Sequence, residues 1–499
     1  LHLGGNVLNK CKDIFTKFYL SVLGVLMVIV IISSIITIFV SHFFLSSDNF
    51  VKSFTSVALI IAIILSIEFY SISSNLHYKR KLFLILVCGF IIRGLWLLNV
   101  KSIPTSDFMT MYNSAQKFVN SDTSMFWGNA YIARFPHLTI MVLYMALMIK
   151  LFPVNNIILM KLINLVLGVL TIYLIYLIVK EVFNSNKKGI YAAVLASVFP
   201  SLVTYTGVFC TENIAIPFYL ISAYMFILTI RKKKSKYSLI LSGVALSLGN
   251  LFRMVAAIMI IAYTMYVLIY SKDKLLSKLR NIALFMIPYY LVLNLVSSTL
   301  QGLKITEYPL WKGSEPKITN MLKGTNIESL GRWNEEDASI VEKNNYDYEK
   351  IEEASIKIIK ERLTTTPLPK LVGFYIKKFA VQWSVGDSDG IYWTKHKVPK
   401  EDIIVDASLE FPQIIYSSMM VLVFLGILNR RKNNEVQEIN LFYIILCGYG
   451  AMNLITESQG RYSYIASWVF IILAVEGINY LDIKFNFGNF KGGRIFGGI

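Results

Sequence analysis

Thiols and imidazoles are scarce in this chain, which has four cysteines and five histidines among its 499 residues. The cysteines are scattered and show no CxxC spacing, so the sequence indicates neither a disulfide framework nor a zinc site. The histidines are equally dispersed, which argues against a histidine-based metal site. We also find no internal repeat, no low-complexity tract and no glycine-rich phosphate loop. No cofactor is therefore expected, and a divalent metal is possible but not indicated.

Charged residues are scarce as well. They make up 16% of the chain, against about 25% in soluble domains, whereas 55% of the residues are hydrophobic. Thirteen apolar segments recur along the sequence, most of them about as long as a membrane-spanning helix. They are residues 18–45, 55–74, 82–99, 136–152, 157–179, 190–208, 213–230, 237–251, 254–271, 282–300, 412–428, 439–456 and 463–479. We therefore predict an all-α polytopic membrane protein with about 12–13 transmembrane helices.

The net charge of +18 is unevenly distributed along the sequence. Residues 301–411 hold 16 Lys/Arg and 18 Asp/Glu, a net of −2, so the rest of the chain carries +20. This excess lies in short loops between apolar segments, which is the positive-inside pattern of membrane proteins and not a nucleic-acid groove. The loops predicted to be cytoplasmic on this ground are 79–81, 231–236, 272–280 and 430–432. Alternation across the membrane then places residues 100–135, 301–411 and 457–462 outside.

Three regions follow from this topology. Residues 1–300 form an N-terminal transmembrane region with its first large outer loop at 100–135, residues 301–411 form an extracytoplasmic domain, and residues 412–499 hold the C-terminal transmembrane helices and a cytoplasmic tail. Thirteen crossings conflict with two cytoplasmic termini. We therefore predict that segment 136–152 lies along the outer interface instead of spanning the membrane.

Helical spacing predicts two elements inside the outer segment. The stretch Glu335–Leu363 is rich in Glu, Lys and Ile with apolar residues at helical spacing, so it is expected to be one helix. It should end before the two prolines that follow. Leu371–Trp383 is apolar and aromatic with paired lysines, which is typical of a helix at the membrane interface.

Two polar strings beside apolar segments are candidates for function. Glu457-Ser-Gln-Gly-Arg461-Tyr462 places a carboxylate and a guanidinium at the edge of the bilayer. An ionisable group at mid-bilayer costs about 2.5–3.5 kcal/mol on insertion scales, so such groups usually mark a pathway or a site. Asp107 lies in a second polar loop. The alternatives are structural: Glu457 and Arg461 could pair at i, i+4, and Asp107 could cap a helix.

The order of the motifs resembles the GT-C superfamily of polytopic glycosyltransferases. It is similar to the bacterial members related to protein O-mannosyltransferases and lipid A aminoarabinose transferases, the glycosyltransferase family 39-like proteins. The resemblance extends over about residues 82–479. The strings that carry it are Ser106-Asp107-Phe108 with Tyr112 and Ala115, Pro136 with Lys150-Leu151-Phe152, Thr211-Glu212, Ser242-Gly243 through Gly249-Asn250 to Arg253, and Glu457 with Arg461-Tyr462.

This resemblance implies a sugar transferase that inverts configuration, in the cytoplasmic membrane of a bacterium, with its site on the outer face. The implied donor is a polyprenyl-phosphate sugar, and the acceptor is an extracytoplasmic glycan, lipid or protein. Membrane lipids are further partners, and no nucleic acid is expected. Asp107, in the outer loop, would be the catalytic base, because a carboxylate can accept a hydroxyl proton without a metal.

Arginines suit the departing phosphate because the planar guanidinium binds it with two parallel hydrogen bonds. The expected phosphate ligands are Arg461, Arg253 and Arg93. The expected substrate-binding residues are Tyr112, Arg134, His137, Glu212, Asn250, Glu457, Gln459 and Tyr462. No metal ligand is predicted.

Two other functions remain open at this stage. A polymerase or ligase of surface polysaccharide also has about twelve spans and a large outer loop with arginines. A transporter or lipid flippase would place charges at mid-membrane in broken helices and would often show inverted repeats. The position of the Asp107 loop early in the chain favours a transferase over a polymerase or ligase. The charged residues gather at one face of the membrane, which favours a transferase over a transporter or flippase.

Overall fold

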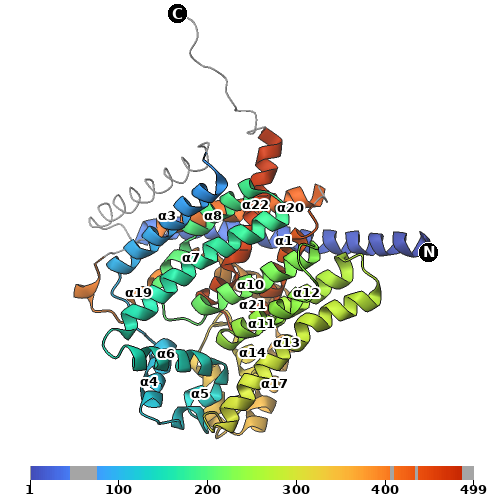
Figure 1. Cartoon of the computed structure of the whole chain (residues 1–499). Helices are drawn as coiled ribbons and strands as arrows, with labels where there is room; N and C mark the ends of the chain where they lie inside the picture. The colour runs from blue at the N-terminus through green and yellow to red at the C-terminus, as the bar shows by residue number, and fades with distance from the viewer. Residues whose placement is uncertain (1, 45–75, 405–408, 433–435, 486–499) are drawn as a thin grey trace, which may run out of the picture.

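The computed structural model describes residues 2–44, 76–404, 409–432 and 436–485, and Figure 1 shows the whole chain. Every regular element in these ranges is a helix. Twelve of the thirteen predicted apolar segments fall on described residues, and all twelve are helical. The segment 55–74 lies outside the described residues. The prediction of an all-α polytopic membrane protein is confirmed.

Seven helices among the described residues are long and apolar enough to cross a membrane. They are α1 (His2–Phe44), α3 (Tyr78–Asn99), α7 (Asn156–Phe183), α10 (Glu212–Ile230), α13 (Leu275–Gly302), α20 (Glu410–Lys432) and α22 (Ser467–Phe485). Three shorter apolar helices accompany them: α11 (Ser238–Phe252), α12 (Ala256–Tyr270) and α21 (Ile439–Ile455). An eighth candidate is bent by 60°, where α8 (Asn186–Val198) meets α9 (Pro200–Thr204) and η3 (Tyr205–Gly207).

The segment between α3 and α7 folds into short helices of its own. These are α4 (Asp107–Val119), η1 (Ser124–Phe126), α5 (Tyr131–Arg134), η2 (Pro136–Leu138) and α6 (Thr139–Leu151). The chain turns by 109° between α5 and α6, at Pro136. Helix α6 packs against α4, and Figure 1 shows α4, α5 and α6 gathered at one end of the molecule, beyond α7.

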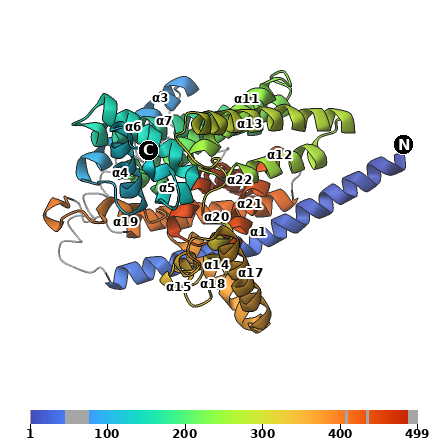
Figure 2. The same ribbon diagram turned by 90° about the horizontal axis from the view of Figure 1, so that it is seen from below.

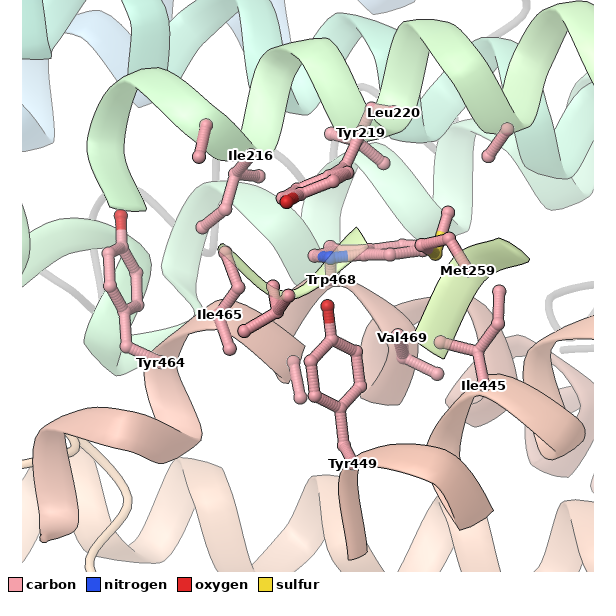
Figure 3. Packing of buried hydrophobic residues seen from close by; sticks show 14 of the residues in the cluster. Ile216, Tyr219, Leu220, Met259, Ile445, Tyr449, Tyr464, Ile465, Trp468 and Val469 are labelled. Atoms are coloured by element: carbon pink, nitrogen blue, oxygen red, sulfur yellow. The ribbon is translucent and has the colours of Figure 1, made fainter. Parts of the chain in front are cut away.

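Helix α22 forms the centre of the core. A helix that is apolar on every side is buried in a large protein, and the residues from Trp468 to Val475 are almost completely buried. Figure 3 shows the Trp468 indole between Tyr219 of α10 and Tyr449 of α21. Helices α20 and α21 also pack against α22. The short helix η5 (Gly460–Ala466), which precedes α22, is therefore held by the most buried part of the structure.

The outer segment after α13 has a small core of its own, built from Leu322, Ile340, Val341 and Ile351. Its helices are α14 (Ile318–Gly324), α15 (Glu335–Ala338), α16 (Ile340–Lys343), α17 (Tyr348–Thr365), α18 (Leu368–Ser384), α19 (Gly390–Lys395) and η4 (Lys400–Asp402). Seen from below, α14, α15, α17 and α18 lie together at one side of the molecule (Figure 2).

One prediction for this segment was wrong. The single helix expected over Glu335–Leu363 is divided into α15, α16 and α17. Asn345 and Tyr346 both have positive φ angles, of 52° and 59°, which interrupts a right-handed helix. The predicted helix at Leu371–Trp383 is present as α18. This helix begins directly after its N-cap residue, Pro367.

Candidate active site

Asp107 and Arg461 meet although they are 354 positions apart in the sequence. The Nη2 atom of Arg461 donates to Oδ2 of Asp107 at 2.7 Å. The Tyr131 side chain also lies close to this carboxylate. The alternative pairing of Arg461 with Glu457 is not seen. Asp107 does not cap α4 either: the N-cap position belongs to Ser106, and no side chain makes a cap hydrogen bond there.

Aromatic rings hold the Arg461 guanidinium in place. Its central carbon lies 5.6 Å from the ring centroid of Phe108, 5.4 Å from that of Trp393 and 5.2 Å from that of Tyr462. Cation–π contacts of this length are attractive, and more so when water is excluded. The Nε atom of Arg461 is buried and has no hydrogen-bond partner among the described residues. The guanidinium therefore keeps a donor for a further acceptor.

A second guanidinium faces the same tyrosine. The central carbon of Arg253 lies 5.0 Å from the Tyr462 ring, and its Nε lies 3.3 Å from Oε1 of Glu212. Arg253 follows the end of α11, and Glu212 is the first residue of α10. Tyr462 is thus shared by two arginines, each of which faces one carboxylate. Such an arrangement has the charge and geometry to hold a phosphate.

The remaining predicted residues near this pair have structural partners as well. Oδ1 of Asn250 accepts from the backbone N–H of Ala256 at 3.1 Å and so shapes the turn between α11 and α12. The Gln459 amide donates to Glu457, which also lies 3.7 Å from Nζ of Lys323.

His137 lies in η2, the short helix that leads into α6. Its ring is half-buried and lies near the positive charges of Arg253 and Lys317. It therefore lies on the side of the site that Arg253 occupies.

Two predicted substrate residues are engaged elsewhere. The Tyr112 hydroxyl donates to Oδ1 of Asn156 at 2.8 Å. Arg134 donates through Nε and Nη2 to Glu315, at 2.8 and 2.6 Å. No hydrogen bond or ion pair among the described residues joins either of them to Asp107 or Arg461. Arg134 instead ties the first outer loop to the segment that follows α13.

Arg93, a predicted phosphate ligand, is buried within the helices. Its Nη1 and Nη2 atoms donate to the carbonyls of Ser197 and Ala196, both at 3.3 Å. Pro200 has no N–H to offer the carbonyl of Ala196, so α8 ends there and the chain bends. Arg93 supplies the donors that the helix cannot.

Replacing Arg93 by Met should therefore lower stability and leave phosphate binding intact. Buried carbonyls without a partner cost about 1–3 kcal/mol each. We expect a lower midpoint of thermal unfolding in detergent, with an unchanged KM for the lipid donor in the folded fraction. If the KM for the donor rises and the midpoint of thermal unfolding does not change, Arg93 is a phosphate ligand and not a structural residue.

The sequence analysis missed an acidic loop beside Gly460. A Cβ atom on Gly460 would lie 2.0 Å from Oδ2 of Asp389, so a larger residue at this position would displace the Asp389 side chain. Asp387, two residues earlier, is completely buried and accepts backbone N–H groups from Asp389 and Ile391. Burial raises the pKa of Asp387 to about 7. The run Gly386-Asp-Ser-Asp-Gly390 is a turn signal, but nothing in it indicates which loop it meets.

Three further residues of the site were also missed: Trp393, Lys323 and Lys378. Nothing in the sequence distinguishes Trp393 from the other aromatic residues, and neither lysine belongs to a recognisable functional motif. Among the described residues, no group of three or more His, Cys, Asp or Glu side chains could hold a metal ion.

Comparison with known families adds independent information. Residues 137–300 match the family described as dolichyl-phosphate-mannose-protein mannosyltransferase. Over this region the sequence resembles that family. The predicted resemblance is thereby confirmed. The matched region contains Glu212, Asn250 and Arg253, whereas Asp107 and Arg461 lie outside it.

Solved structures of an oligosaccharyltransferase from the archaeon Archaeoglobus fulgidus also match. The apo form has a TM-score of 0.47 at 14% identity and covers 80% of this chain and 50% of that chain. The complex with an inhibitory peptide and a dolichol-phosphate has a TM-score of 0.43 at 14% identity, covering 81% and 51%. The form tethered to an acceptor peptide has a TM-score of 0.48 at 14% identity, covering 81% and 50%. The chain thus spans about half the length of these structures. Curated protein sequences give no match.

Proposed function

We propose that this protein transfers a sugar from a polyprenyl-phosphate carrier to an extracytoplasmic acceptor. The observation that carries the proposal is the ion pair between Asp107 and Arg461, with Arg253 in contact with the same Tyr462 ring as Arg461. A base beside two phosphate-binding cations is what such a transfer requires. The family match, whose description names a dolichyl-phosphate sugar, supports a lipid-phosphate donor.

The reaction is a single displacement with inversion at the anomeric carbon. The acceptor hydroxyl oxygen forms a bond to that carbon while the bond to the phosphate oxygen breaks, and the electron pair leaves with the carrier phosphate. Asp107 accepts the hydroxyl proton, while its Oδ2 is held by Arg461. Arg461 and Arg253 stabilise the charge that develops on the phosphate.

The remaining residues around this pair would bind the substrates. Glu212 and Glu457 hold Arg253 and Lys323, so they set the positions of two cations. The oxygens of these carboxylates, and that of the Gln459 amide, could accept further hydrogen bonds from the hydroxyl groups of a sugar. The Tyr462 ring contacts both guanidiniums and so helps to hold them in position beside the substrates. His137 and Asn250 would line the substrate site on the side where Arg253 lies.

The decisive experiment is a transfer assay with purified protein in nanodiscs. A polyprenyl phosphate carrying a radiolabelled mannose is the donor, and washed membranes of a bacterial strain lacking this protein provide the acceptor. Label should leave the carrier and enter the acceptor fraction. Movement of intact donor between leaflets of proteoliposomes, without loss of label from the carrier, would favour a flippase. Donor that is neither consumed nor moved would exclude both functions for this carrier.

The proposal also places the site on the outer face of a bacterial cytoplasmic membrane, which labelling can test. Cysteines introduced at Glu352 of α17 and at Ser235 between α10 and α11 are both exposed at the protein surface. An impermeant thiol reagent applied to intact cells should modify Glu352→Cys and spare Ser235→Cys, because basic loops stay in the cytoplasm. The wild-type protein provides the background from the native cysteines. The reverse pattern would put the site on the cytoplasmic face.

A further inference from the structure

Side chains of helix α18 hydrogen-bond to the backbone of the loop that leads to Arg461. The C-terminal end of α21 leads through Thr456, Glu457, Ser458 and Gln459 into η5. The last carbonyls of any helix have no partner within that helix and need one from elsewhere. In this protein Lys378 of α18 supplies a donor for Leu454 and for the C-cap residue Thr456, and Gln382 of α18 supplies one for Gln459 in the loop that follows.

Lys378 is completely buried, and its ammonium meets three backbone carbonyls. Nζ donates to Leu454 at 2.8 Å, to Thr456 at 2.7 Å and to Gly324 at 2.6 Å. An ammonium has three N–H donors, so its hydrogen-bonding capacity is completely used. Its positive charge also lies at the C-terminal end of α21, where the helix dipole favours a cation. No other residue type offers three donors from one atom.

The junction leaves no room for another arrangement. A Cβ on Gly324, at the end of α14, would lie 2.4 Å from the carbonyl oxygen of Ile455. A Cβ on Gly331 would lie 2.7 Å from Cε of Lys378, and the carbonyl of Gly331 accepts from the backbone N–H of Ser458 at 2.7 Å. The backbones of the outer segment and of α21 therefore touch around the lysine.

Gln382 lies one helical turn after Lys378, on the same face of α18. Its Nε2 donates to the carbonyl of Gln459 at 2.8 Å, and its Oε1 accepts from the Ser458 hydroxyl at 2.6 Å. The chain from Leu454 to Gln459 is thus fixed at both ends by one helix. Arg461 follows two residues later.

We propose that Lys378 is a positioning residue for catalysis: it fixes the Arg461 loop, and with it the phosphate-binding guanidinium, against the outer segment. This inference rests on the proposed function of Arg461. Under this proposal, the outer segment from Ile318 to Ser384 helps to set the geometry of the site as well as covering it. Neither Lys378 nor Gln382 touches Asp107, so their effect on transfer passes through the loop.

The test combines Lys378→Met with Arg461→Lys in a double-mutant cycle. Methionine has a similar length but no donors, so it leaves three carbonyls without a partner. Displacing a catalytic group by about 1 Å can cost about 10²-fold in rate, so Lys378→Met should lower transfer by that order. In the Arg461→Lys background the same change should have a much smaller effect, since residues that act as one unit are not additive. Lys377→Met, the exposed neighbour on the same helix, is the matched control.

Amide hydrogen exchange gives a readout that does not depend on activity. Peptides covering residues 454–461 should exchange faster in Lys378→Met than in the wild type or in Lys377→Met. Gln382→Met removes only the second anchor and should act in the same direction, which keeps the test valid if Lys378→Met fails to fold. Equal loss of transfer in both backgrounds, or unchanged exchange, would overturn the positioning role. Wild-type activity of Arg461→Lys would instead contradict the phosphate-binding role of the Arg461 guanidinium, and the exchange data would still test whether Lys378 fixes the loop.

Discussion

Asp107→Asn should lower the rate of sugar transfer by about 10²–10⁴-fold, the usual contribution of a general base. Asparagine has the same size and can still accept a hydrogen bond from Arg461, but it cannot take a proton from the acceptor hydroxyl. Asp107 makes no cap hydrogen bond in α4, so its replacement removes none. The protein should therefore insert and unfold like the wild type. The measurement is the transfer rate at saturating donor and acceptor.

Asp122→Asn is the matched control for this variant. Asp122 lies in the same outer loop, where its Oδ1 accepts the backbone N–H of Ser124 at 2.8 Å, a role that asparagine can also fill. Its transfer rate should stay close to that of the wild type. If Asp107→Asn loses less than about threefold, general-base catalysis by Asp107 is excluded, since the smallest expected loss is about 10²-fold.

Arg461→Lys should lower transfer by about 10–100-fold, although it keeps the positive charge. A hydrogen bond to a charged group contributes about 1.5–3 kcal/mol, and 1.36 kcal/mol corresponds to a factor of ten in rate. Lysine cannot present two parallel N–H groups to a phosphate. It would also lose the planar contacts with Trp393 and Tyr462. The loss should be seen mainly in kcat, because the phosphate gains charge as it leaves.

The matched control is Arg362→Lys. Arg362 makes the same kind of contact in the outer segment, where Nη1 and Nη2 donate to Asp337 at 3.2 and 2.7 Å. Losing that fork should reduce the thermal stability of the segment without changing transfer by the folded protein. If Arg461→Lys and Arg461→Ala both transfer sugar at the wild-type rate, Arg461 is only a structural partner of Asp107.

The helices could be predicted because hydropathy is a local property. Each apolar segment predicts a helix at its own position, and twelve of these predictions can be checked in the described residues. The division of Glu335–Leu363 could not be predicted, because Asn345 and Tyr346 carry no strong turn signal and their positive φ angles depend on packing. Short polar loops between long helices gave the topology, and the topology indicated that Asp107 and Arg461 approach each other.

The partners of buried charges were beyond the reach of the sequence. An arginine within an apolar run can bind a ligand or a backbone carbonyl, and nothing around Arg93 reveals the bend at Pro200. Lys378 was understood as part of a lysine pair at the membrane interface, whereas it points inward and only Lys377 is exposed. In each case the decisive partner is distant in the chain and belongs to the backbone, which leaves no trace in side-chain patterns.

The 354 positions between Asp107 and Arg461 have a consequence for biosynthesis. The Asp107 loop and the region that matches the glycosyltransferase family are translated before the guanidinium that faces Asp107. Under the proposed function, a nascent chain cannot transfer sugar before the segment that carries Arg461 has been inserted. Premature termination between Asp107 and Arg461 would therefore yield a protein that has the base but lacks the phosphate-binding guanidinium beside it.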